Sequence, residues 1–433
     1  MTDMPTEQPT ADRKRRIFAR LTGSDPADLQ QDEAANGLIH VTALSLTKVA
    51  DSLIDPKLVL AWLLSALGAP GFIIGALVPV REAGSLLPQL ILARRVEQVA
   101  QRKRIWAMGA AMQGLSVLGI AWAVLTLQGA VAGWTVLGLL AVLATARAAA
   151  SVSYKDVLAR TVAMGRRGAV SGLAGVAASV AAFGFGLLMA LGIFDLAIPV
   201  LATALAVAGG AFLLAGALFL RLAEPANAGE APDDNGAAAL FRPLFEDRQL
   251  QMFVAARAAL TVTALAPPFI VMLSSANGQR ALDQLGPMVM ASTAAAVVSS
   301  YVWGRLSDRS SRQTLMAAGA LASVVLLIIG LVGMQPVGLG GAWGAGLAVF
   351  AAQIAYEGVR AGRKLHLTDM ATDDFRARYT ALSNTLIGVV LMAGGVFGLL
   401  ADRFGPAILL VVFAVLSLVG AIIASRLDEV QRP

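Results

Sequence analysis

The sequence predicts an all-α polytopic membrane protein in which twelve transmembrane helices form two bundles of six. Hydrophobic residues make up 57% of the 433 residues and charged residues only 14%, and the mean hydropathy is +0.71. So few charged residues cannot cover the surface of a water-soluble protein of this size. Long apolar stretches recur along the whole chain, and basic residues gather in alternate connections between them. Both patterns are typical of helical membrane proteins.

Twelve apolar stretches are each long enough to cross a bilayer, which takes about 20 residues of helix. The expected spans are 38–66, 70–92, 105–127, 131–152, 169–191, 196–221, 249–273, 285–305, 314–334, 342–362, 380–401 and 405–425. Glycine and proline mark several of the divisions, as at Gly405–Pro406. Within the seventh span, Pro267–Pro268 is expected to break the helix, and the alternative is simple packing.

Basic residues indicate how the spans are oriented. The connections after spans 2, 4, 8 and 10 contain sixteen Lys and Arg residues, whereas the odd-numbered connections contain two. The positive-inside rule therefore places the even-numbered connections and both termini in the cytoplasm.

A polar linker and an internal repeat divide the chain into halves. The expected units are an N-terminal tail (1–37), a six-helix bundle (38–222), a cytoplasmic linker (223–248), a second six-helix bundle (249–426) and a C-terminal tail (427–433). Residues in the two halves match at nearly one shift: Arg102 with Arg312 at 210, Pro56 with Pro267 at 211, and Arg147 with Arg360 at 213. Duplicated bundles around a midplane cavity are typical of secondary transporters.

The connection after span 8 resembles the G-x-L-x-D-R-x-x-R loop signature of the major facilitator superfamily. The matching residues are Gly304, Leu306, Asp308, Arg309 and Arg312. With the twelve spans, the repeat and the linker, the chain resembles a bacterial-type transporter of this family over nearly its whole length. The resemblance implies a multi-pass protein of the cytoplasmic (inner) membrane that works as a monomer. Span 5 lacks the G-P-x-x-G-G pattern of the family's drug/proton exporters, so that branch is not indicated.

The signature residues are candidates for a cytoplasmic latch. Gly304, Asp308, Arg309 and Arg312 lie where a carboxylate and guanidiniums can form charge-assisted hydrogen bonds across the cytoplasmic face. Such bonds would hold one conformation and break when the halves rock. The alternative is an orientation signal combined with helix capping.

Ionisable residues inside the expected spans are the main candidates for a functional site, because an unpaired charge at bilayer depth is costly. The candidates for proton coupling are Asp51, Glu82, Asp55 and Glu357, and those for substrate binding are Lys48, Arg81, Arg147 and Arg257. Arg147 also resembles the family's intramembrane arginine of span 4. Asp51 and Arg81 are expected at similar depth. Fixed ion pairs of Asp51 with Lys48 or Arg81, which would only hold helices together, are the alternative.

These features favour a secondary transporter that moves a small organic solute by alternating access, with protons as the coupling ion. The intramembrane arginines suggest an anionic solute. The alternative is a non-transporting membrane protein of the same family type, an assembly or sensing factor, which has no need of charges within the bilayer. An enzyme is not expected, because no H-E-x-x-H, G-x-S-x-G or P-loop motif occurs. Neither a cofactor, a metal ion nor a nucleic acid is expected as a partner.

Overall fold

The computed structural model describes residues 8–30, 32–89, 92, 96, 98–192, 197–226, 242, 244–275, 285–336, 338–370 and 373–431. These residues form helices and connections, and no strand occurs among them. The helices are α1 (Gln8–Thr22), the short 3₁₀ helix η1 (Pro26–Asp28), α2 (Glu33–Ile54), α3 (Val59–Ala66), α4 (Gly71–Leu86), α6 (Lys103–Thr126), α7 (Gly129–Thr161), α8 (Met164–Ala190), α9 (Ile198–Phe219), α11 (Arg248–Leu260), α12 (Val262–Ser275), α13 (Leu285–Arg309), α14 (Ser311–Gly333), α15 (Gly341–Met370), α16 (Asp373–Ala393), α17 (Val396–Phe404) and α18 (Pro406–Ala424).

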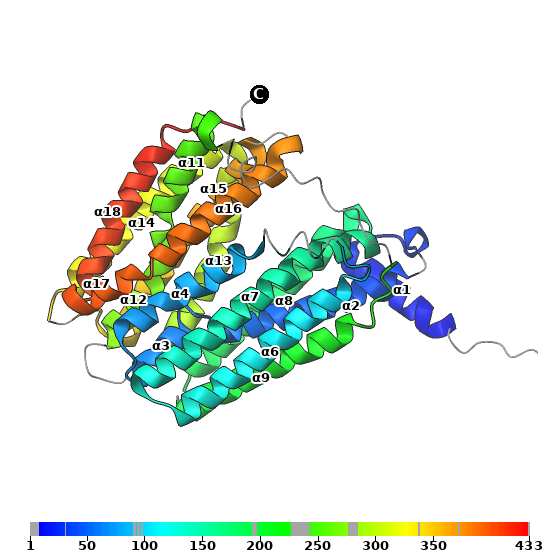
Figure 1. The fold of residues 1–433 in the computed structure, drawn as a ribbon, viewed down its shortest axis with the longest axis horizontal. Helices are drawn as coiled ribbons and strands as arrows, with labels where there is room; N and C mark the ends of the chain where they lie inside the picture. Colours follow the sequence, from blue (N-terminus) through cyan, green and yellow to red (C-terminus); the bar gives the residue numbers. More distant parts are fainter. Residues whose placement is uncertain are drawn as a thin grey trace, which may run out of the picture.

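The helices form two bundles (Figure 1). Helices α2 to α9 make the first bundle, in which α6 packs against α7 and α9. Helices α11 to α18 make the second, in which α14 packs in the same way against α15 and α18. The bundles meet where α3, α4 and α8 contact α12, α13, α16 and α17. The predicted two-bundle helical fold is therefore confirmed.

Nine helices in the described part of the chain are long and apolar enough to cross a membrane. They coincide with nine of the expected spans. The other three expected spans fall on α2 with α3, on α4 and on α15. Of these, α3 and α4 are short, with 8 and 16 residues, whereas α2 and α15 are long but carry several charged residues.

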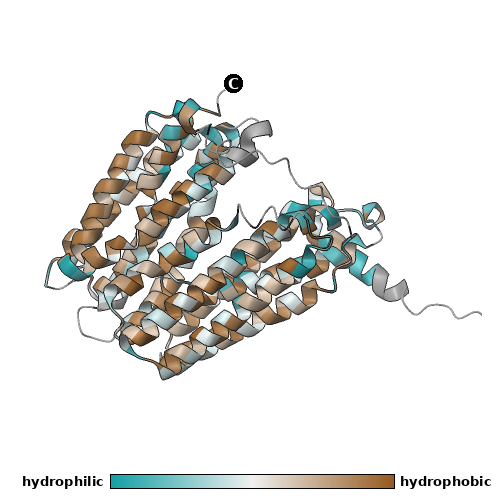
Figure 2. Ribbon diagram, viewed as in Figure 1, coloured by the Kyte–Doolittle hydropathy of each residue, from teal (hydrophilic) through white to brown (hydrophobic). Residues whose placement is uncertain are grey.

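Large apolar side chains cover the outside of both bundles. Leu115, Trp122 and Val131 are 62%, 58% and 63% exposed. Exposed apolar surface on this scale suits contact with lipid rather than with water. In Figure 2 hydrophobic residues run along the helices, while hydrophilic residues gather near the C-terminus and near α1.

Both bundles begin with an interrupted helix. In the first bundle α2 ends at Ile54 and α3 begins at Val59. Asp55 lies at this break, and its Oδ1 accepts a hydrogen bond of 2.9 Å from the backbone amide of Lys57. Pro56 follows Asp55 and has no amide hydrogen with which to continue α2. Asp55 therefore caps the break between α2 and α3. Its role in proton coupling stays a prediction.

The break in the second bundle is not where the sequence suggested. Helix α11 ends at Leu260 and α12 begins at Val262, so the interruption is at Thr261. Pro267–Pro268 lies inside α12, so the expectation that the helix breaks at these prolines was wrong. The physical reason is that a proline ring collides with the turn that precedes it, which moves the distortion toward the N-terminus. The Thr261 hydroxyl, which donates to the carbonyl of Arg257 at 2.8 Å, adds to the bend.

The bundles pack closely at the end opposite α1 and the C-terminus, which we call the far end. A Cβ added to Gly75 of α4 would lie 2.8 Å from the Cα of Gly398 on α17, and one added to Gly286 of α13 would lie 2.5 Å from the amide nitrogen of Ala190. Only glycine permits backbones to approach so closely. Figure 1 shows the bundles diverging toward the other end, at which α1 and the C-terminus lie.

Candidate functional site

Asp51 of α2 is held by two arginines. Its Oδ1 accepts a hydrogen bond of 2.7 Å from Arg81 Nη2 on α4, and its Oδ2 accepts one from Arg147 Nη1 on α7. The expectation that Asp51 and Arg81 share one depth is confirmed. Each carboxylate oxygen of Asp51 is thus engaged by a guanidinium. The three residues form a clamp that connects α2, α4 and α7.

Lys48 lies one turn before Asp51 on α2, but its ammonium is directed elsewhere. Its Nζ donates to the backbone carbonyl of Ser171 on α8 at 3.0 Å. A cavity of about 200 Å³ inside the first bundle is lined by Lys48, Asp51 and Arg147, together with Tyr154. The first bundle thus contains polar space, although its carboxylate is already paired.

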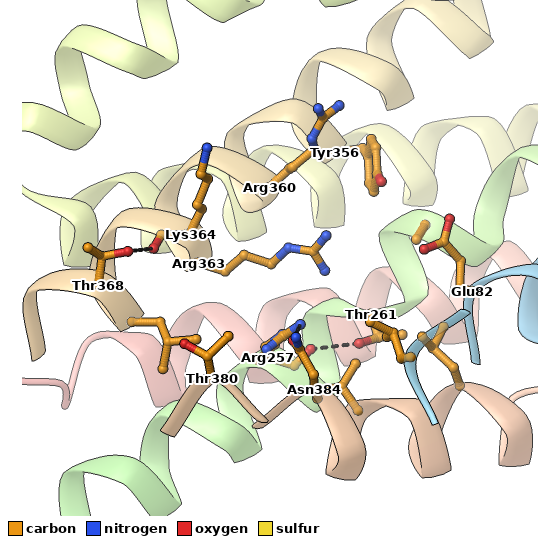
Figure 3. A pocket seen from close by; sticks show the side chains of 15 residues that line it. Glu82, Arg257, Thr261, Tyr356, Arg360, Arg363, Lys364, Thr368, Thr380 and Asn384 are labelled. Atoms are coloured by element: carbon orange, nitrogen blue, oxygen red, sulfur yellow. Dashed lines mark hydrogen bonds between the residues drawn. The ribbon is translucent and has the colours of Figure 1, made fainter. Parts of the chain in front are cut away.

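A larger cavity of about 420 Å³ lies between the two bundles. Helix α4 contributes Glu82 and Leu86 from the first bundle, and the segment from α11 to α12, α15 and α16 supply the rest of its lining. Four cationic side chains line it, namely Arg257, Arg360, Arg363 and Lys364. Figure 3 shows Arg363 extending across the cavity toward Glu82, with Arg257 and Asn384 on the opposite wall from Tyr356. Glu82 is the one carboxylate among the described lining residues.

Arg257 makes hydrogen bonds only with neutral groups. Its Nη1 donates to Ser383 Oγ at 2.7 Å and its Nη2 donates to Asn384 Oδ1 at 3.0 Å. The side chain is buried, and its Nε has no partner in the described part of the chain. Arg363 and Glu82 have neither a hydrogen bond nor an ion pair with described residues. Glu82 nevertheless lies in the electric field of Lys57, Arg81 and Arg363. Arg257, Arg363 and Lys364 have no carboxylate within ion-pair distance among the described residues.

A smaller cavity of about 170 Å³ adjoins the larger one, since Tyr356 and Arg360 line both. It contains the two other proton-coupling candidates, Asp55 and Glu357. Glu357 pairs with Arg360 at 3.3 Å on the same helix. Lys57 of the first bundle lies over the ring of Tyr356, with its Nζ 3.7 Å from the ring centroid. This cation–π contact connects the bundles beside the cavity.

Sequence reasoning missed most of the cations around the cavity. Arg363 and Lys364 were counted as members of the connection after span 10, but α15 continues to Met370 and places them in the cavity wall. A usable signal was present, because Tyr356, Arg360, Arg363 and Lys364 recur at i, i+4, i+7 and i+8. This spacing puts all four on one face of a helix.

Of the latch candidates, Gly304, Asp308 and Arg309 lie in the last turns of α13 and Arg312 lies in the first turn of α14. No hydrogen bond or ion pair joins them to the first bundle among the described residues. Asp308 and Arg309 are exposed, and Gly304 faces open space. Arg312 lies 3.6 Å from Glu429 of its own half. This arrangement agrees with bundles that are apart at this end, and the latch stays a prediction.

The equivalent stretch of the first half, 93–102, is only partly described. Arg94 and Arg95 lie outside the described residues, and Arg102 forms an ion pair with Asp156 of α7. The two histidines have structural hydrogen bonds: His40 with Thr161 at 2.8 Å and His366 with Ser311 at 2.8 Å. No group of three or more metal-type ligands occurs among the described residues.

Solved structures of solute transporters share this arrangement, although no family model and no curated protein matches the sequence. The nucleoside transporter NupG has a TM-score of 0.66 at 12% identity, with 89% of this chain and 98% of that chain covered. A POT family transporter in complex with a thioalcohol-conjugated peptide has a TM-score of 0.68 at 10% identity, with 90% and 95% covered.

A bacterial homologue of the human lysosomal transporter Spinster, in an inward-facing and unoccupied conformation, is also similar. Its TM-score is 0.58 at 13% identity, and the match covers 95% of this chain and 97% of that chain. At such low identities the likeness concerns the fold. The chain has the fold of the transporters of the major facilitator superfamily.

Proposed function

We propose that the protein is a secondary active transporter that moves a small organic anion by alternating access of a central cavity. The observation that carries this proposal is the cavity of about 420 Å³ between the bundles, which four cations and one carboxylate line. A protein that serves only as a scaffold gains nothing from such charges, since each one costs stability in the membrane. The bundles pack closely at the far end and diverge at the other end. This is the arrangement expected of one conformation of a cycle in which the two bundles rock against each other.

Glu82 is the proposed proton carrier. It faces the same cavity as Arg363 but has no hydrogen-bond or ion-pair partner in the described part of the chain, whereas Asp51 is engaged by two arginines. A carboxylate without a fixed partner can take up and release a proton as access to the cavity changes. Asp51 is then the organiser of the first bundle, and Asp55 and Glu357 have local partners of their own.

The proposed setting is a bacterial-type cytoplasmic membrane, with both termini in the cytoplasm and the protein acting as a monomer. The excess of Lys and Arg in the even-numbered connections supports this orientation. In it, the far end is the outer side, and the cavity faces the cytoplasm.

A liposome assay tests the proposal. The full chain is reconstituted into vesicles that contain a pH-sensitive dye, and organic anions, which a thermal-shift screen in detergent has selected, are added under a pH gradient. The wild type is expected to move protons only when a transported anion is present. Glu82→Gln should retain binding and anion exchange but lose proton movement, because the amide cannot be protonated at neutral pH.

Asp12→Asn, the same change at an exposed position in α1, is the matched control and should behave as the wild type. Proton movement that survives Glu82→Gln would contradict the role of Glu82. Failure of every solute to cross the membrane would instead favour the non-transporting assembly or sensing factor.

A further inference from the structure

The cavity between the bundles offers hydrogen-bond donors far more than acceptors. Arg363 presents a whole guanidinium without a partner in the described chain, and Arg257 presents a buried Nε. Asn384 accepts from Arg257 through its Oδ1, so its amide NH₂ remains to donate. A ligand that fits such a wall carries several acceptor atoms and negative charge, as carboxylates and phosphates do.

The net charge of the cavity wall determines which ligand charge fits it best. Glu357 neutralises Arg360 at 3.3 Å, which leaves Arg257, Arg363 and Lys364 against the single carboxylate of Glu82. The remaining excess is two positive charges. An uncompensated charge in a medium of low dielectric constant is costly, so a ligand with two negative charges compensates this wall best.

By the internal repeat, the two bundles differ in charge at matching positions. In the first bundle, the chain itself supplies a carboxylate, Asp51, between Arg81 and Arg147. The repeat relates the halves by shifts of 210 to 213 residues, so Asp51 corresponds to residues 261–264, which read Thr-Val-Thr-Ala. Of the two arginines around Asp51, Arg147 corresponds to Arg360, which pairs with Glu357, whereas Arg81 corresponds to residues 291–294, which contain no cation. The second bundle thus repeats neither the carboxylate nor the whole clamp.

Resting on the transport function proposed above, we infer that the cavity binds an organic dianion whose negatively charged oxygen atoms lie between Arg257 and Arg363. A phosphate monoester and a dicarboxylate share this chemistry. The rest of the molecule would contact the apolar part of the wall, formed by Leu86, Ile387 and Leu391. A volume of about 420 Å³ is in the range of small-molecule sites.

Binding to the purified full chain in detergent, measured by titration calorimetry, tests this inference without requiring transport. The first arm compares glycerol 3-phosphate with glycerol and with a phosphodiester that carries one charge. The second arm compares succinate with its monomethyl ester and with succinamide. The dianion of at least one arm is expected to bind on the order of 10-fold or more tightly than its singly charged analogue, and the arm that binds identifies the head group.

Three variants assign the site. Arg363→Gln is expected to weaken dianion binding on the order of 10- to 100-fold, the usual effect of losing a charged hydrogen bond, while Arg363→Lys retains part of the affinity. Arg257→Gln should act similarly, but Arg257 is buried, so Arg363 is the more decisive site. Arg426→Gln, at an exposed position of the same half, should bind as the wild type.

The inference is wrong if the singly charged or neutral analogues bind as tightly as the dianions, if no dianion binds, or if Arg363→Gln leaves the affinity unchanged. Its failure is distinct from that of the transport function. Transport of a cation or a neutral solute would refute the dianion site but leave the transport function standing. Tight dianion binding without flux would refute transport but leave the dianion site standing.

Discussion

Replacing Gly398 by alanine is expected to push the bundles apart at the far end. A Cβ at this position would lie 2.6 Å from the Cα and 2.8 Å from the carbonyl oxygen of Phe72 on α4. Both atoms belong to the backbone, so no side-chain rotation relieves the overlap. Carbon atoms in contact lie about 3.5–4.0 Å apart, so α17 and α4 must separate by about 1 Å.

The size of the effect follows from this overlap. Overpacking of this kind costs about 1–3 kcal/mol, and the cost applies only in the conformation in which α4 and α17 touch. The conformation open at the far end has no such contact and carries no cost. The ratio of the two conformations should therefore shift by roughly 5- to 140-fold toward the one open at the far end.

The chain contains no cysteine, which makes site-specific spin labelling simple. Val131 at the start of α7 and Phe404 at the end of α17 are exposed, lie in different bundles and belong to the far end. Changing both to cysteine and labelling them allows the distance between the bundles to be measured by pulsed electron spin resonance. In Gly398→Ala the population with long distances should grow.

Gly138→Ala is the matched control, because a Cβ on this glycine of α7 meets nothing within 4 Å. It should leave the distance distribution as in the wild type. A distribution that is the same in Gly398→Ala as in Gly138→Ala would refute the idea that close glycine contacts hold the far end shut.

Three further changes test other contacts. Asp402→Ala removes the acceptor for the Phe72 amide at the start of α4, a bond of 2.9 Å between the bundles, and should widen the same spin-label distances less than the glycine change does. Asp51→Asn leaves Arg81 buried without its counter-charge, so it should lower the free energy of unfolding by about 3 kcal/mol. Chemical unfolding in detergent measures this loss, and the double variant Asp51→Asn with Arg81→Gln should recover part of the lost stability. Burial disfavours the ionised form of Glu33, but hydrogen bonds from Arg166 and two backbone amides outweigh it and lower the pKa of this carboxyl below 4.5. The stability that Glu33 adds is therefore present above pH 4.5 and is lost as the pH falls through its folded pKa. In Glu33→Gln the thermal unfolding midpoint should therefore depend less on pH below 4.5 than it does in the wild type.

The fold could be predicted because lipid imposes a simple rule on sequence. A spanning helix must be apolar over about 20 residues, and this pattern located nine helices that the structure confirms as membrane-spanning in length and composition. Helix interruptions were harder. The proline pair at 267–268 suggested a break, whereas the bend lies at Thr261, because a proline distorts the turn before it.

The candidate site could be predicted only in part. Similar depth in two helices predicted the pair of Asp51 and Arg81, because depth follows from position along a span. Depth alone could not show that Arg147 engages the second carboxylate oxygen, since that depends on how α7 faces α2. Hydropathy placed Arg363 in a connection, because the apolar stretch of the span ends where the charged residues begin. The helix itself continues beyond that point and lines the cavity.

The unequal charge of the two halves bears on why transport would require the substrate. In the proposed transport cycle, closing the cavity would remove water from the cations of the second bundle, and each charge that loses water without a partner costs several kcal/mol. In the first bundle, Asp51 offsets part of the charge of Arg81 and Arg147. In the second bundle Arg257 and Arg363 lack such a carboxylate among the described residues, so the empty cavity resists closure. In that cycle a bound dianion would remove this resistance, and the difference between the empty and the loaded cavity would couple closure to the substrate.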